Sequence, residues 1–142
     1  MNFKDFEQAL SSARLNRYVE ACNHDSRKAM TLYRYNLRLS QELFTILSCF
    51  EVTLRNSIDQ RLRLSLGSDW LLDSFQTGGI FDTPKLTRTS NIVRGGYRRL
   101  QEMGKPYSHE GLLSEMEFGV WKHMFSREQF AATGRCLLAI FP

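Results

Sequence analysis

The chain has 142 residues, a length typical of one domain, with 42% hydrophobic and 24% charged residues and a formal net charge of +4. Ten Phe, five Tyr and two Trp exclude a disordered or low-complexity protein, and no apolar run reaches the roughly 18 residues of a membrane span. Three widely spaced cysteines and a charged N-terminus indicate neither a disulfide framework nor a signal peptide, so a cytoplasmic protein is predicted.

Two helical stretches are predicted in the first half of the chain. Over residues 3–22, apolar side chains recur at steps of roughly three to five residues, which predicts one helix. Asp25 or Ser26 is expected to cap the next helical stretch, residues 27–66, which contains neither Gly nor Pro and ends at Gly67. This stretch predicts one long helix or two nearly collinear helices. Its apolar stripe follows helical spacing through Leu43, Leu47, Phe50, Leu54, Ile58 and Leu62.

The second half predicts shorter helices. Residues 67–84 are loop-like around a short capped turn that carries a buried Trp70. Further helices are expected over residues 85–100, over about 108–125, and from near Ser126. Gly119 lies inside the apolar face of the second of these, which indicates close packing against another helix. No β alternation or internal repeat is visible, so we predict a single all-α domain over residues 1–142, a helical bundle with one long central helix.

The positive charge is concentrated in one segment. Residues 85–105 contain six basic residues and one acidic residue, Glu102. Such a segment neutralises phosphates, with strong salt dependence, and Tyr97 within it offers a ring on which a base could stack. The alternative is a solvated helix face with no partner. The expected RNA-binding residues are therefore Lys85, Arg88, Arg94, Tyr97, Arg98, Arg99 and Lys105.

The residue types that carry most enzyme chemistry form no recognisable site. His24, His109 and His123 do not pair with one another or with a cysteine at metal-ligand spacing, so neither a metal nor another cofactor is predicted. Gly78-Gly79 and Gly95-Gly96 do not match a nucleotide-binding loop. The cysteines lie in apolar contexts and are expected in the core: Cys22, Cys49 and Cys136.

Three stretches resemble a known family. Residues 32–40 (LYRYNLRLS) lead into residues 50–58 (FEVTLRNSI), and residues 113–121 (LSEMEFGVW) follow later, before a final Phe141-Pro142. These stretches are similar to the Abi-like proteins of bacterial abortive infection, of the AbiD and AbiF type, in which YxxNxxLS, ExxLRNxI and ExxFGxW elements recur in that order. The resemblance covers about residues 30–142.

The resemblance implies a role in phage defence and an α-helical bundle of the HEPN superfamily, many members of which are metal-independent ribonucleases that act as dimers. The family's nuclease motif, Arg-Asn followed within a few residues by His, lies beyond the point where this chain stops, so the domain is expected to be C-terminally shortened. Arg55-Asn56 matches its first half only, because position 59 is Asp and position 61 is Arg.

Three hypotheses follow. In the first, the chain is a shortened Abi-like protein that binds RNA or a partner chain. In the second, it is a ribonuclease whose active site forms across a dimer from Arg55, Asn56 and a His. In the third, it is a structural helical interaction module. Arg55 and Asn56 are thus weak catalytic candidates. The simpler interpretation is a structural polar cluster with Glu51, which precedes Arg55 by four residues in the order that favours an ion pair.

A homodimer is the expected assembly, and no membrane partner is predicted. On the long helix, Tyr33, Leu37 and Phe44 widen the apolar stripe to more than one side. The apolar run over residues 137–141 adds a surface that the family's next segment is expected to cover. Large exposed apolar surfaces usually mark an interface, and a two-fold dimer is the commonest way to bury one.

Overall fold

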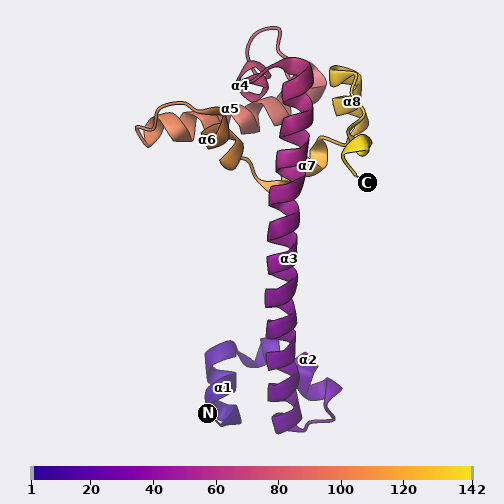
Figure 1. Ribbon diagram of the computed structural model, residues 1–142. Helices are drawn as coiled ribbons and strands as arrows, with labels where there is room; N and C mark the ends of the chain where they lie inside the picture. Colours follow the sequence, from indigo (N-terminus) through magenta and orange to yellow (C-terminus); the bar gives the residue numbers. More distant parts are fainter. Residues whose placement is uncertain (1, 142) are drawn as a thin grey trace. The chain divides into compact units, whose positions relative to one another are not determined.

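The computed structural model describes residues 2–141, which form helices and no strands (Figure 1). This confirms the predicted all-α bundle with one long helix. The chain groups into two compact units, Met1–Cys49 and Phe50–Pro142. The expectation of one domain stays a prediction, since two cores on one shared helix can still unfold together. No helix in residues 2–141 is long and apolar enough to cross a membrane.

The first unit contains α1 (Phe3–Leu10), α2 (Ser12–Ala21) and the start of α3 (Ser26–Leu66). The prediction of one helix over residues 3–22 is wrong, because Ser11 has φ +71° and interrupts the helix there. The core of the first unit consists of Phe6, Leu15, Tyr18, Ala29 and Tyr33. In this core the Tyr33 ring makes edge contacts with the rings of Phe6 and Tyr18, with centroid distances of 5.5 and 5.1 Å.

The ends of α3 lie where the sequence predicts them. The Asp25 carboxylate accepts hydrogen bonds from the backbone N–H groups of Arg27 and Lys28 at 3.1 and 3.0 Å, and so caps the helix. After Leu66, Gly67 has φ +104°, a conformation that side chains rarely adopt, and the helix ends. Local capping chemistry therefore sets both ends of this long helix.

The second unit packs the C-terminal part of α3 against short helices. These are α4 (Trp70–Asp73), η1 (Pro84–Leu86), α5 (Thr87–Glu102), α6 (His109–Ser114), α7 (Phe118–His123), α8 (Arg127–Thr133) and η2 (Leu137–Ile140). The buried turn at Trp70 and the capped start of α8 at Ser126 are confirmed. The predicted helix over residues 108–125 is split, because Glu117 is extended between α6 and α7. The core centres on Ile58, Leu62, Trp70, Leu112 and Trp121.

Close backbone packing occurs at Gly96 rather than at Gly119. A Cβ at Gly96 would overlap the methyl group of Met116 and lie 3.3 Å from Glu115 Cβ, so glycine allows α5 to approach the end of α6. Nothing lies within 4 Å of a Cβ built at Gly119, so close packing there is not observed and that prediction is wrong.

The cysteines are less buried than their apolar neighbours predict. Cys22 is half-buried, whereas Cys49 and Cys136 are exposed. The expectation that all three lie in the core is therefore wrong. Residues that are adjacent in sequence point in different directions on a helix or turn, so apolar neighbours do not imply that the cysteine itself is buried. In the last segment, Leu137 is buried, and the Phe141 ring lies 5.6 Å from the Phe125 ring.

Candidate functional site

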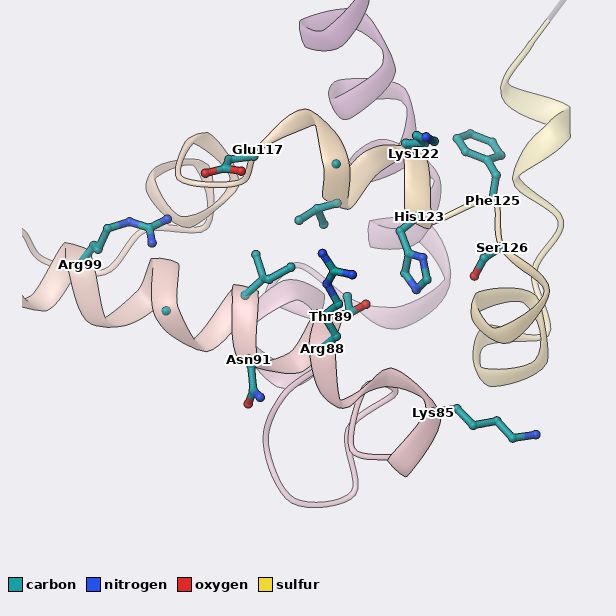
Figure 2. Close-up of a pocket in the computed structure, with 14 residues that line it drawn as sticks. Lys85, Arg88, Thr89, Asn91, Arg99, Glu117, Lys122, His123, Phe125 and Ser126 are labelled. Carbon is teal, nitrogen blue, oxygen red and sulfur yellow. The ribbon is translucent and has the colours of Figure 1, made fainter.

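A cavity of about 850 Å³ lies in the second unit, with walls from α5 and α7 (Figure 2). Lys85 of η1 and the turn after α7 complete the wall. The lining residues are Lys85, Arg88, Thr89, Asn91, Ile92, Gly95, Arg99, Glu117, Gly119, Val120, Lys122, His123, Phe125 and Ser126. Volumes of this size are typical of sites that enclose small ligands.

Helical spacing explains how α5 lines this cavity. Arg88, Ile92, Gly95 and Arg99 follow one another at steps of four, three and four residues, so they share one face of the helix. This face presents a cation at each end with an apolar side chain and a bare glycine between them. On α7, Lys122 and His123 line the opposing wall, and Figure 2 shows Arg88 and His123 projecting into the space between the two helices.

The cavity is strongly basic. Lys85, Arg88, Arg99 and Lys122 line it, against one carboxylate, Glu117. Arg99 is held by Glu115, since its Nε donates to Glu115 Oε2 and its Nη2 to the Glu115 carbonyl, both at 3.0 Å. By contrast, within the described residues the other three cations form no ion pair. On this concave surface three cations without an ion pair outnumber the one free carboxylate, and such an excess of positive charge attracts anions.

Part of the cavity lining is apolar, and the lining lacks side chains at two points. Ile92, Val120 and Phe125 contribute non-polar side chains, and Gly95 and Gly119 expose backbone only. The space beside Gly119 is open, and the nearest atom to a Cβ at Gly95 is Arg99 Nη1 at 3.8 Å. The lining of the cavity thus combines cations with non-polar side chains.

The structure brings Lys85, Arg88 and Arg99 together, but not the other predicted RNA-binding residues. Arg94 donates to the Phe75 carbonyl at 3.2 Å and lies 5.8 Å from the Phe75 ring. The half-buried Tyr97 ring packs between the rings of Phe75 and Tyr107, at 5.9 and 6.1 Å, and so does not serve as an exposed stacking surface. Arg98 pairs with Glu102 at 3.8 Å. Exposed Lys105 is not among the lining residues.

Lys122 and His123 are lining residues that sequence reasoning missed. They lie outside the basic segment at 85–105, and only the packing of α7 near α5 places them on the same cavity. Their position in the sequence is the one signal that could have indicated them. They directly follow Trp121, the last residue of the ExxFGxW element, and lie on the same short helix as the buried Val120 and Trp121.

Within residues 2–141, no ion pair joins the members of the predicted polar cluster on α3. Glu51 and Arg55 are half-buried and Asn56 is exposed. Arg55 Nε is buried without a hydrogen-bond partner, and within residues 2–141 no ion pair joins Arg55 to Glu51. Neither Arg55 nor Asn56 lines the cavity. The structure thus places the weak catalytic candidates apart from the basic site.

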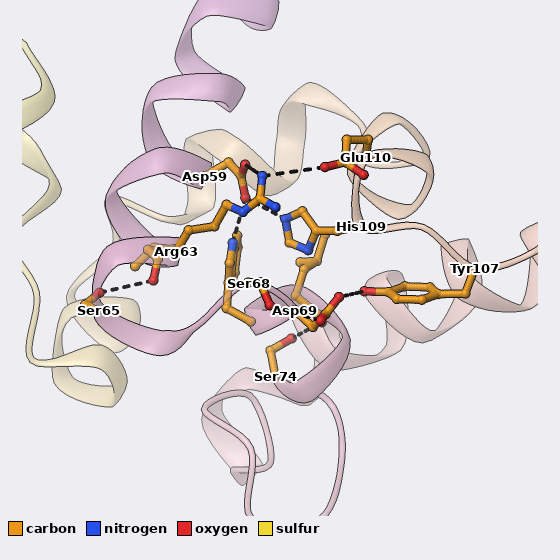
Figure 3. A network of polar contacts seen from close by, with 12 residues as sticks. Asp59, Arg63, Ser65, Ser68, Asp69, Ser74, Tyr107, His109 and Glu110 are labelled. Atoms are coloured by element: carbon orange, nitrogen blue, oxygen red, sulfur yellow. Dashed lines mark hydrogen bonds and ion pairs between the residues drawn. The ribbon is translucent and has the colours of Figure 1, made fainter.

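A buried polar network, which the sequence did not reveal, links α3 to α4 and α6 (Figure 3). Asp59 Oδ1 accepts a hydrogen bond from Trp70 Nε1 at 2.8 Å and lies 2.6 Å from Nε2 of the buried His109. Arg63 Nη1 lies 3.7 Å from Asp59 and 3.6 Å from Glu110. This network connects core elements and is therefore structural.

A separate hydrogen bond joins the half-buried side chains of Tyr107 and Asp69. The Tyr107 hydroxyl donates to Asp69 Oδ1 at 2.8 Å (Figure 3). Burial, and then this hydrogen bond, raise the pKa of the Tyr107 phenol above its usual range. The hydrogen bonds from Tyr107 and Ser68 hold the pKa of Asp69 below its usual value. The pair therefore keeps its hydrogen bond across the physiological pH range.

Among the described residues, no group of three or more His, Cys, Asp or Glu side chains could hold a metal ion. No protein-family model, curated protein or solved structure matches this chain.

Proposed function

We propose that this chain is an Abi-like protein of phage defence that binds RNA through the basic cavity between α5 and α7. The observation that carries the RNA-binding part is that Lys85, Arg88 and Lys122 all line one cavity and that none of them forms an ion pair with a described residue. RNA supplies the dense phosphate charge that such a cluster favours. The three family-like sequence elements supply the biological setting.

The proposal does not extend to RNA cleavage. A ribonuclease site built from Arg55 and Asn56 requires these residues to meet the bound RNA, and they do not line the cavity. Lys85, Arg88 and Lys122 bind phosphates as cations that remain charged at neutral pH. Phosphate binding by these three side chains therefore requires no chemical step.

Removing two of the cations that line the cavity is expected to weaken RNA binding at least about tenfold. The variant is Arg88→Ala/Lys122→Ala, which changes both walls of the cavity. The matched control is Arg98→Ala/Lys105→Ala, which removes the same charge from the same unit at exposed positions outside the cavity. Fluorescence anisotropy with a labelled single-stranded RNA measures the affinity. Equal weakening by both variants would assign binding to general charge and contradict the proposal.

A second surface favours self-association through α3. Leu32, Leu39, Leu43 and Ile46 follow steps of seven, four and three residues, the spacing of a coiled-coil seam. Each of these side chains is 40% to 63% exposed. We propose that this seam pairs with the same seam of a second copy, which yields a two-fold homodimer.

Charges on the seam are expected to convert the dimer to a monomer. Leu43→Glu/Ile46→Glu places two carboxylates at exposed seam positions, so the fold of each protomer is preserved while the apolar contact is lost. The control, Gln41→Glu/Thr45→Glu, adds the same charge to the opposite side of the helix. Sedimentation equilibrium at micromolar concentration measures the mass. A monomeric unchanged protein, or equal masses for both variants, contradicts the proposed dimer.

A further inference from the structure

We infer that the basic cavity takes one unpaired base of single-stranded RNA, with the neighbouring phosphates on its cations. This inference rests on the proposed RNA binding and adds the class of RNA and the part of it that enters. It follows from the volume of the cavity, from its apolar lining residues and from its single carboxylate.

The site is concave, whereas phosphate contacts require only an exposed surface. Phosphates of a duplex lie on its outside and are met by cations on an exposed surface. Here the cations surround a cavity of about 850 Å³, within the range of pockets that enclose a small organic ligand. A base of a single strand is free to enter such a space, whereas a paired base must first break its pair and its stacking.

The apolar lining residues offer non-polar surface to the ring of a base. Ile92, Val120 and the half-buried Phe125 line the cavity, together with the bare backbone of Gly95 and Gly119. Phosphates gain nothing from such a surface, but the faces of a base are apolar and pack on aromatic and aliphatic side chains. The two glycines keep their part of the lining free of side chains, and both lie in helices, where glycine is otherwise unfavourable.

Glu117 is the one acidic side chain that lines the cavity. Its carboxylate favours a ligand group other than phosphate. A carboxylate repels phosphate, yet it accepts hydrogen bonds from the exocyclic amino group of a base. Within the described residues Glu117 forms no ion pair, so its oxygens remain available to such a donor. The cavity therefore provides separate partners for the phosphates, the ring and the edge of one nucleotide.

Gly119→Leu tests the inference by filling the cavity without changing its charge. Nothing lies within 4 Å of an added Cβ, and residue 119 lies inside α7, so leucine is accommodated and favours the helix. We expect the affinity for single-stranded RNA to fall at least about fivefold while the affinity for duplex RNA stays unchanged. The control is Ala131→Leu, which adds similar bulk at an exposed position of α8. Circular dichroism checks that both variants fold.

A second measurement uses the unchanged protein and needs no variant. A single-stranded RNA and an oligonucleotide of equal length with abasic sugars carry the same phosphates, so the inference predicts at least about fivefold weaker binding of the abasic strand. Equal affinities, together with weaker binding by Arg88→Ala/Lys122→Ala, would overturn the inference and leave the proposed RNA binding intact. Loss of affinity in neither the cation variant nor the glycine variant would overturn both.

Discussion

Asp59→Ala lowers the free energy of unfolding of the second unit by about 2–5 kcal/mol, because it leaves two buried polar side chains without their hydrogen-bond partner. The change removes the acceptor of Trp70 Nε1 and the partner of His109 Nε2, both in the core. His109 Nδ1 is already buried without a partner, so the variant leaves the whole imidazole unsatisfied. Urea unfolding monitored by the fluorescence of the buried Trp70 and Trp121 measures the loss.

The control for this variant is Asp73→Ala, which removes the same charge from an exposed position at the end of α4. Its expected effect lies within about 0.5 kcal/mol, as for most surface substitutions. A loss below about 1 kcal/mol for Asp59→Ala, or equal losses for both variants, would show that the network in Figure 3 contributes little to stability.

Gly79→Ala is expected to destabilise the same unit by about 3 kcal/mol, because the new methyl group meets backbone. A Cβ at this position would overlap the Asp73 carbonyl oxygen and lie 2.5 Å from the Ser74 carbonyl oxygen. The Ser74 carbonyl also accepts the backbone N–H of the buried Phe81 at 2.8 Å, so the loop cannot shift without moving a core ring.

Gly78→Ala is the matched control for the loop. Gly78 has φ +80°, so alanine there carries a conformational cost of about 1–2 kcal/mol, but nothing lies within 4 Å of its Cβ. The difference between the two variants in thermal unfolding isolates the steric contribution. A Gly79→Ala variant as stable as Gly78→Ala would contradict the close approach of the Asp73 and Ser74 carbonyls.

The sequence predicts the end of a helix correctly where a single capping or terminating residue determines it. Asp25 caps α3 and Gly67 ends it, and both act through backbone chemistry that the sequence displays. The break at Ser11 was not predicted, because a serine with positive φ is uncommon and neither Gly nor Pro marks the site. The turn at Glu117 depends on how α6 and α7 pack, which periodicity does not encode.

At the candidate site, too, the sequence predicts local features, and tertiary packing decides the rest. The segment at 85–105 predicts that cations gather there, but helical spacing and packing decide which of them share the cavity. Arg94 is directed to the Phe75 carbonyl and Arg98 to Glu102, whereas Arg88 lines the cavity. Lys122 reaches this cavity from a helix distant in sequence, and only tertiary structure reveals that contribution.

The salt dependence of RNA affinity tests the central proposal, that phosphates contact the cavity, most directly. The logarithm of the association constant falls linearly with the logarithm of salt concentration, with a slope set by the number of phosphates neutralised. For single-stranded RNA we predict that Arg88→Ala/Lys122→Ala reduces the magnitude of this slope by about 1.4, which corresponds to two lost contacts, and that Arg98→Ala/Lys105→Ala leaves it unchanged. An unchanged slope for the cavity variant, or an equal reduction for both, would contradict the proposal.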